Sequence, residues 1–250
     1  MRQISKFKVK KVPSSNLKVK SNHKVQSSNL KVQSKESSNL KVQSKLKALL
    51  PSTYFGPIQW YQKLNRYDEC LIERHESFIK QTYRNRMIIP TTNGPLSLTI
   101  PTNHDISLSM KDIRISDHAN WRHVHWNALL SAYGESPFFE YYQDDIRPFY
   151  EKKYEFLFDF NMETTEKMIE LLDIRPKISI TEAYIQSKEL KEEDEIKDFR
   201  DAIRPKKPLP DAEFAPKRYY QVYGQKHGFQ PNMSILDLLF NEGNEAIFYL

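Results

Sequence analysis

Three cationic side chains, Lys80, Arg84 and Arg86, offer the first candidate for chemistry in this chain. Their spacing would place them on one side of an extended strand, because successive strand residues point to opposite faces. An Asn93-Gly94 pair follows and leads into a second alternating segment, which predicts a β-hairpin carrying a row of cations. Such a row could hold a phosphate or a carboxylate, since arginine offers paired N–H donors. The alternative is an ordinary solvated sheet face.

A second candidate lies between Asn120 and Trp126, where an arginine and histidines stand beside tryptophans. On a helix, Arg122 falls four residues before Trp126 and therefore projects onto its apolar face. An arginine on a core-facing side needs an acidic partner or a ligand. We therefore consider Arg122 as an anion clamp and His125 as a general acid or base. The alternative for His125 is a hydrogen-bonded core histidine.

A third candidate is the polar set of Ser234, Asp237 and Asn241 near the end of the chain. Spacings of three and four residues place these side chains on one face of a helix. A nucleophile beside a carboxylate is one interpretation. The other is a helix start, because Ser-x-x-Asp before an apolar run is typical of a capping box, with Ser234 as the N-cap.

The chain lacks the residues that several classes of site require. It has six glycines, none placed to form a Walker phosphate loop or a G-x-G-x-x-G dinucleotide motif, so no cofactor is expected. Its one cysteine, Cys70, excludes an internal disulfide and a thiolate zinc site and indicates a reducing, cytoplasmic compartment. The histidines at 118, 123 and 125 do not share a helix face, so no metal site is expected.

The positive charge is concentrated at the amino-terminal end of the chain. Residues 1–46 contain 12 lysines and arginines and one acid, whereas the remainder has 26 basic and 31 acidic residues. The motif S-S-N-L-K-V recurs three times in this part, which predicts a disordered, low-complexity basic arm. The arm could tether nucleic acid or an anionic membrane, or be a dispensable duplicated extension. We expect no stable nucleic-acid binding, because the arm has no aromatic beyond Phe7 for stacking, and no apolar run predicts a membrane span.

Residues 47–250 are expected to form one compact domain of α/β class, with mixed α+β as the variant. The domain is expected to contain a β-hairpin and a helical middle section. Strands are predicted at 48–50, 69–73, 106–115 with a break near 111, 178–181 and 219–223. Helices are predicted at 58–64, 117–133, 138–150, 162–172 and 234–240, with Gly134 and Gly243 as terminators. The charged segment 189–201 is expected to be a solvated helix, and 204–216 a loop.

Four blocks in order resemble the WbqC-like family and together cover nearly everything from residue 50 onward. They read P-S-T-Y-F-G-P-I-Q-W-Y-Q-K-L from Pro51, K-Q-T-Y-R-N-R from Lys80, N-W-R-H-V-H-W-N-A-L-L-S-A-Y-G-E-S-P-F-F from Asn120, and G-F-Q-P-N-M-S-I-L-D-L-L-F-N-E-G from Gly228.

The resemblance implies a bacterial protein of surface-polysaccharide (O-antigen-type) synthesis. The implied activity is a transferase that acts on an anionic or activated sugar intermediate, with glycine or acyl transfer as one suggestion. The anionic small molecule would be the partner, and the oligomeric state is left open. Together with the cation row, the resemblance nominates as substrate-binding residues Lys80, Tyr83, Arg84, Asn85, Arg86, Arg122, Gln221, Ser234 and Asn241. It nominates His125 and Asp237 as catalytic residues.

The chain also departs from the family pattern. Many relatives open with H-Q-P-x-Y, whereas this chain has Leu50 at the histidine position. Many also carry a glycine-rich segment before the last block, whereas residues 186–218 contain no glycine. These departures keep a second hypothesis open, namely a non-catalytic binding or assembly protein of the same fold. A third is a nucleic-acid-associated protein that acts through its arm.

Overall fold

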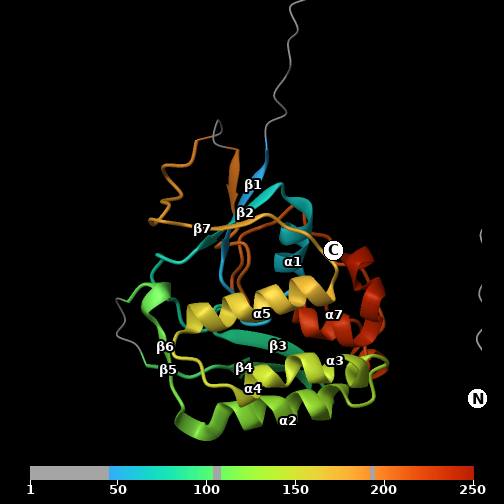
Figure 1. Ribbon diagram of the computed structural model, residues 1–250. Helices are drawn as coiled ribbons and strands as arrows, with labels where there is room; N and C mark the ends of the chain where they lie inside the picture. Colours follow the sequence, from blue (N-terminus) through green and yellow to red (C-terminus); the bar gives the residue numbers. More distant parts are fainter. Residues whose placement is uncertain (1–44, 104–107, 192–194) are drawn as a thin grey trace, which may run out of the picture. The chain divides into compact units, whose positions relative to one another are not determined.

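The computed structural model describes residues 45–103, 108–191 and 195–250 (Figure 1). The predicted disordered arm falls outside these residues except for its last two positions. The predicted strand position at Ile106 also lies outside them.

A four-stranded parallel sheet forms one end of this part of the chain (Figure 1). Its order is β7 (Ile178–Ile180), β2 (Glu69–Glu73), β1 (Lys47–Pro51) and β8 (Ile196–Asp198). The central strand β1 pairs with Glu69–Glu73 on one side and with Ile196–Asp198 on the other. Parallel strands need crossover connections, and helix α1 (Ile58–Arg66) supplies the one from β1 to β2. The expected α/β class is confirmed, with antiparallel pairs added elsewhere.

The strand order reverses at β1. The chain passes from β1 to β2 and β7 on one side of the sheet and then returns to place β8 on the other side. In open parallel sheets, ligands bind outside the carboxyl ends of the strands, near such a reversal. The topology therefore directs attention to the residues that follow β1, β2, β7 and β8.

The predicted hairpin is present but shorter than expected. Strands β3 (Arg86–Thr91) and β4 (Gly94–Thr99) pair in antiparallel register, and Thr91 faces Gly94. The turn is therefore Thr92-Asn93 rather than Asn93-Gly94. Gly94 opens the second strand with a φ of 99°, a conformation that glycine adopts readily.

The predicted row of cations on one strand face is wrong. Residues 80–85 form turns, and the strand begins only at Arg86. The Tyr54 amide donates to the Tyr83 carbonyl at 2.9 Å, and the Asn161 side chain donates to the Arg84 carbonyl at 2.8 Å. The turns therefore lie over the loop that follows β1, and these tertiary contacts override the alternating pattern.

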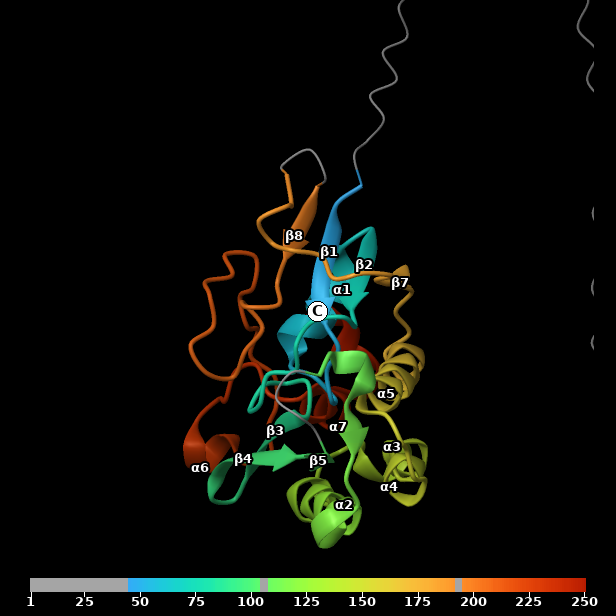
Figure 2. The same ribbon diagram turned by 90° about the vertical axis from the view of Figure 1, so that its left-hand side faces the viewer.

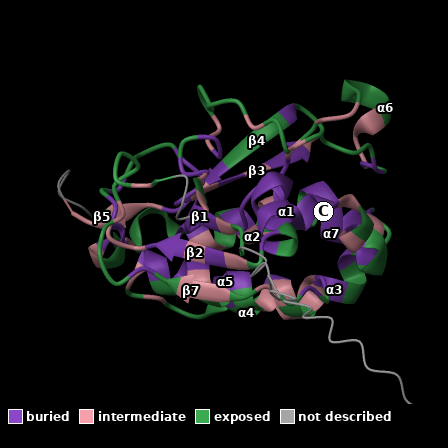
Figure 3. Ribbon diagram, turned by 90° about the horizontal axis from the view of Figure 1, so that it is seen from above, coloured by how far each residue is buried: buried purple, intermediate pink, exposed green. Residues whose placement is uncertain are grey.

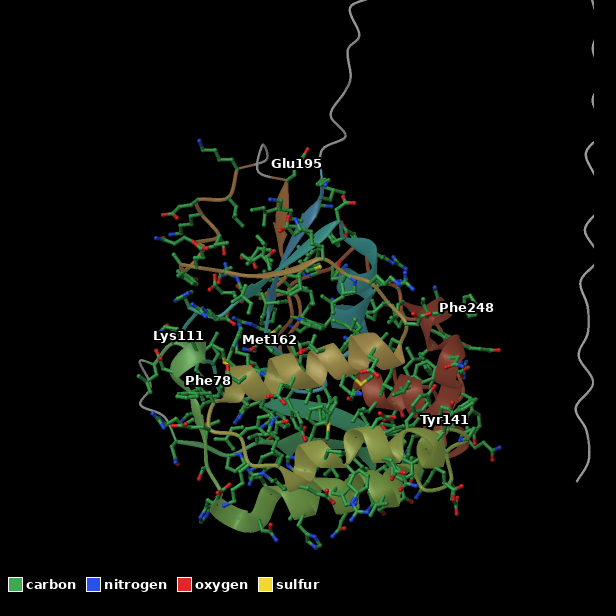
Figure 4. All side chains as sticks on the ribbon, in the orientation of Figure 1. Phe78, Lys111, Tyr141, Met162, Glu195 and Phe248 are labelled. Carbon is green, nitrogen blue, oxygen red and sulfur yellow. The ribbon has the colours of Figure 1, made fainter. Side chains whose placement is uncertain are left out.

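The segment between the hairpin and the helices is more irregular than expected. A short pair, β5 (Thr102–Asn103) and β6 (Arg114–Ile115), flanks a 3-10 turn, η1 (Met110–Asp112). Residues 74–78 run beside 108–111, because Lys111 N donates to Arg74 O and Phe78 N donates to Leu108 O. Figure 4 shows Phe78 and Lys111 on this side of the molecule.

The helical middle section is confirmed, with shifted boundaries. A 3-10 turn η2 (His118–Asn120) precedes α2 (Trp121–Tyr133), and Gly134 keeps a helical φ of −55° instead of a left-handed one. The predicted helix 138–150 is divided into α3 (Phe139–Ile146) and α4 (Pro148–Glu151), because proline cannot donate the next helical hydrogen bond. Helix α5 (Leu157–Leu171) starts five residues earlier than predicted.

Two predictions in the last third of the chain are wrong. The charged segment 189–201 contains strand β8 rather than a solvated helix in its described part, and residues 219–223 form no strand. Helices α6 (Gly224–His227) and α7 (Ile235–Glu242) and the 3-10 segment η4 (Gly243–Tyr249) complete the chain. Gly243 ends α7 with a φ of 57°, as predicted.

The core lies between the parallel sheet and the helical section. Helices α5 and α7 and strand β3 occupy this middle level, with α2 beyond them (Figures 1 and 2). Seen from above, the interior elements β1, β2, α1 and α7 are buried, whereas α6 and much of β4 are exposed (Figure 3). The Trp60 indole donates to the Pro51 carbonyl at 2.8 Å and so holds α1 against the end of β1.

Candidate functional site

A cavity of about 410 Å³ lies at the carboxyl ends of the parallel strands, and we call it the sheet-edge pocket. Its lining comes from the segments that follow β2, β7 and β8. The lining residues are His75, Glu76, Ser77, Ile79, Tyr184, Ser187, Asp198, Arg200, Asp201 and Arg204. The pocket therefore lies where the strand order leads one to look for a ligand.

Glu73, the last residue of β2, organises the floor beside this pocket. Its fully buried carboxylate accepts hydrogen bonds from the His75 amide at 2.7 Å, the Thr181 hydroxyl at 2.8 Å and the Ile185 amide at 3.0 Å. These bonds hold the loop that follows β7 against the end of β2. Arg200 lies 3.6 Å from the same carboxylate.

Arg200 stands two residues beyond the end of β8 and is 5 % exposed. Its Nε and Nη2 atoms donate to both oxygens of Asp198, at 2.9 and 2.6 Å. Burial alone would lower the pKa of Arg200, but the bonds to Asp198 outweigh burial and raise it. Its remaining nitrogen, Nη1, is buried and makes no hydrogen bond within the protein. This nitrogen is the atom that lies 3.6 Å from the Glu73 carboxylate, so it is held in an ion pair.

A buried ion pair, Glu76 with Arg84, forms another part of the wall. Arg84 Nε donates to Glu76 at 2.6 Å, and Nη2 donates to the second carboxylate oxygen. The Arg84 side chain is 1 % exposed. Arg84, expected to bind substrate directly, instead uses its whole bidentate edge to orient Glu76. Its influence on the pocket therefore passes through that carboxylate.

The rim of the pocket is less buried. Arg204 pairs with Asp201, and its Nε atom is buried without a hydrogen-bond partner. Tyr184 is half exposed, and its ring lies 5.2 Å from the Arg200 guanidinium. The Ser187 hydroxyl donates to Asp198 at 2.6 Å. The rim thus combines cations, carboxylates, a hydroxyl and an aromatic ring.

Arg122 lies in a different place, beside the start of α2. It lines a second cavity of about 360 Å³, the α2 hollow, together with Asn120, His123, Trp126, Arg147, Tyr150, Glu151 and Lys153. Its Nη1 atom contacts Asp117 at 2.5 Å, and its guanidinium stacks on Trp121 at 4.7 Å. The predicted acidic partner is therefore present.

His125 is 3 % exposed and lines neither the sheet-edge pocket nor the α2 hollow. Its Nδ1 atom lies 2.9 Å from the Tyr54 hydroxyl, which lies 2.9 Å from the Tyr150 hydroxyl. Burial lowers the pKa of His125 to about 4, against a smaller opposing effect of a backbone hydrogen bond at Thr99. The imidazole is therefore neutral near pH 7, in the hydrogen-bonded core environment that was its alternative interpretation.

Asp237 is fully buried in a polar cluster of its own. Its carboxylate accepts hydrogen bonds from the Tyr219 hydroxyl and from the Gln221 amide, the latter at 2.8 Å. Burial raises the pKa of Asp237 to about 6, and these bonds oppose the rise. The Asn241 amide donates to the Asp237 backbone carbonyl at 2.7 Å. Asp237, Gln221 and Asn241 therefore hold the carboxy-terminal segments together.

Ser234 acts as the N-cap of α7. Its hydroxyl accepts from the Leu236 amide at 3.3 Å and donates to the Phe55 carbonyl at 2.7 Å. The capping interpretation describes its geometry, although Asp237 turns to the buried cluster rather than back to the cap.

The remaining nominated residues are dispersed. Lys80 is exposed, Tyr83 is buried, and Asn85 donates to the Ile100 carbonyl at 2.9 Å. Arg86 donates to the Thr99 hydroxyl at 2.9 Å. Neither the sheet-edge pocket nor the α2 hollow gathers Arg86, Arg122, His125 and Asp237 together.

The described residues contain no group of three or more His, Cys, Asp or Glu side chains that could hold a metal ion. Cys70 is buried and unpaired, and burial raises the pKa of its thiol to about 12. None of the helices in the described ranges has both the length and the apolar character of a membrane span.

The pocket residues His75, Glu76, Arg200 and Arg204 were not singled out from the sequence. A signal for the first two existed, because they directly follow the correctly predicted strand Glu69–Glu73. No comparable signal pointed to the arginines, since their strand β8 lies within a charged segment.

Comparison with known proteins supports one assignment. A protein of Mycobacterium tuberculosis (strain ATCC 25618 / H37Rv), named uncharacterized protein Rv1507c, is 25 % identical over 229 residues, which cover 82 % of this chain and 97 % of the relative. No solved structure matches the chain. Residues 52–205 and 211–249 match the WbqC-like protein family. The chain belongs to the WbqC-like protein family.

Proposed function

We propose that this protein is a cytoplasmic transferase of bacterial surface-polysaccharide (O-antigen-type) synthesis, and that the sheet-edge pocket holds its anionic or activated sugar substrate. Family membership over most of the chain supports the pathway. The pocket's position at the carboxyl ends of the parallel strands supports the location of the site.

The observation that carries the proposal is the incompletely bonded Arg204 in this pocket. Its Nε atom is buried without a hydrogen-bond partner, whereas Arg200 Nη1 is ion-paired to Glu73. Leaving the Arg204 donor unpaired is unfavourable, because it has lost its water without a replacement. An oxygen of a phosphate or carboxylate in the pocket would satisfy it.

The rest of the lining suits a hydroxyl-rich ligand. The carboxylates of Asp198 and Asp201 and the hydroxyls of Ser77 and Ser187 can accept hydrogen bonds from sugar hydroxyls. The half-exposed Tyr184 ring offers an apolar face against which a sugar ring can pack. The sheet-edge pocket can therefore hold a ligand that combines an anionic group with a sugar ring.

His75 is a pocket residue that can donate a hydrogen bond to a ligand. Its Nε2 atom accepts a hydrogen bond from Arg74 Nε at 3.2 Å, because an arginine nitrogen only donates. The nitrogen left to donate is therefore Nδ1. This residue lines the pocket, whereas the originally nominated His125 does not. A transferred glycine or other acyl group is the class of reaction that the family resemblance suggests.

A non-catalytic binding or assembly protein is the second candidate. It is favoured by the placement of His125 and Asp237, because both nominated catalytic residues are buried in hydrogen-bond networks. A binding protein would retain one anionic ligand and would show no turnover with any acyl donor.

A thermal-shift screen of the full chain tests the proposal. It would compare nucleotide sugars, acyl donors and glycine, because a ligand of the folded state raises the melting temperature. A stabilising nucleotide sugar is expected, and its effect should be lost in Arg204→Gln. The exposed Arg175, outside both cavities, gives the matched control Arg175→Gln. Equal stabilisation of Arg204→Gln and wild type would contradict this location.

A further inference from the structure

We propose that the α2 hollow is a second ligand site, which takes a two-oxygen anion, a phosphate or a carboxylate, attached to a small ring. It is lined by residues separate from those of the sheet-edge pocket and does not depend on the proposed function.

The anchor is the open edge of Arg122. An arginine holds a carboxylate or phosphate side-on through Nε and Nη2, which point the same way. Arg84 uses this edge for Glu76, and Arg200 uses it for Asp198. In Arg122 both atoms are buried and neither has a hydrogen-bond partner.

Asp117, the acid that pairs with Arg122, leaves that edge free. Asp117 contacts the third nitrogen, Nη1, at 2.5 Å and also contacts Lys153 at 2.8 Å. The Asp117 side chain is 53 % exposed, whereas that of Arg122 is 13 % exposed. The charge of Asp117 is therefore screened by water, while Arg122 keeps two desolvated donors.

The surrounding charge favours an anion. Three cations, Arg122, Arg147 and Lys153, line the hollow. The carboxylate among the lining residues, Glu151, is exposed and contacts Arg147. With Asp117 included, cations still outnumber carboxylates, so an entering anion meets a net positive field.

The hollow also has an apolar wall. Trp126 and Tyr150 line it, with their ring centroids 5.8 Å apart. The Tyr150 hydroxyl is engaged by Tyr54, so this tyrosine presents its ring rather than a free donor. A small ring bearing the anion can pack against these aromatics. Because Arg122 Nε and Nη2 are shielded from solvent, a side-chain movement within the hollow must accompany binding.

Isothermal titration of the full chain tests this site with inorganic phosphate, glucose 1-phosphate, glucuronate and neutral glucose. Glucose 1-phosphate or glucuronate is expected to bind, and glucose is not. The order of the affinities of the two anions distinguishes a phosphate site from a carboxylate site. Arg122→Lys keeps the charge but loses the side-on edge, so it should weaken binding by about tenfold or more. Lys153→Gln should weaken it less, by roughly two- to fivefold, and reduce its salt dependence.

The controls separate this site from the sheet-edge pocket. Arg204→Gln and Arg175→Gln should bind the same probe as wild type does. If Arg204→Gln loses binding of the probe and Arg122→Lys retains it, the ligand belongs to the sheet-edge pocket and this proposal is overturned. Absence of saturable binding by all three anions would also overturn it. If melting by circular dichroism shows that Arg122→Lys is unfolded, Lys153→Gln becomes the deciding variant. An affinity and a salt dependence equal to those of wild type in Lys153→Gln would then overturn the proposal.

Discussion

His125 shows how burial determines what a residue can do. Its Nδ1 atom lies beside the Tyr54 hydroxyl, and its pKa is lowered to about 4 because the charged ring would be desolvated. At neutral pH the ring is uncharged and lies outside both cavities. The sequence offered a general base or a core histidine, and helix position alone could not decide between them.

The lowered pKa of His125 predicts an acid-sensitive fold. Since the folded pKa is below the unfolded value of about 6.5, the stabilising contribution is present above that value and is lost as pH falls towards 4. It is at most about 3 kcal/mol. Urea unfolding of wild type and His125→Gln at pH 7, 6, 5 and 4.5 measures it. The free energy of unfolding should fall less with acid in the variant.

A matched control for that experiment is His123→Gln, because His123 is exposed and bonds only to Asn127 in the described contacts. It should follow the wild-type pH profile. Asp237 works in the opposite direction, since its raised pKa of about 6 makes its contribution disappear as pH rises. A wild-type profile in His125→Gln would show that His125 is not the acid-sensitive group.

The Glu76–Arg84 pair predicts a strong dependence of one residue on the other. Arg84→Met alone should lower the free energy of unfolding by about 3–5 kcal/mol, because it leaves a buried carboxylate without its cation. The double variant Arg84→Met with Glu76→Leu should recover much of that loss. Chemical denaturation of wild type, Arg84→Met, Glu76→Leu and the double variant checks this. Additive losses would mean that the pair is not coupled.

At the scale of elements, local patterns succeed where burial is continuous. The apolar runs at β1 and β2 were recognised, and α1 and α7 were correctly placed within two residues. The hairpin start failed because Arg84 reaches Glu76 and Tyr83 packs in the core, contacts that alternation does not reveal. Strand β8 was missed because it has only three residues, two of them charged, and a strand at the edge of a sheet can form from so short and polar a segment.

Helix α7 gives an element-scale prediction. Gly243 ends it with a φ of 57°, and an added Cβ would approach the Phe138 ring at 2.8 Å. Gly243→Ala should therefore lower the free energy of unfolding by roughly 2 kcal/mol through strain and crowding. Gly224→Ala is the matched control, because its nearest neighbour would lie at 3.8 Å. Urea melts of equal midpoint for the two variants would contradict the proposed role of Gly243.

At the scale of the molecule, the strand order determines which segments meet. His75, Ser187 and Arg204 line one cavity because β2 and β8 flank β1 in the sheet. His75 is separated from the other two by more than a hundred positions in the sequence, and no local pattern states which strands are neighbours. The family could be recognised from short blocks, whereas the pocket required the topology.

The central claim is that the sheet-edge pocket binds an anionic or activated sugar. The most direct measurement is isothermal titration of the best nucleotide sugar from the thermal screen into wild type, Arg204→Gln, Arg122→Lys and Arg175→Gln. A Kd that rises about tenfold or more only in Arg204→Gln is expected, because that variant removes a charged donor from the pocket. An unchanged Kd in Arg204→Gln would contradict the account.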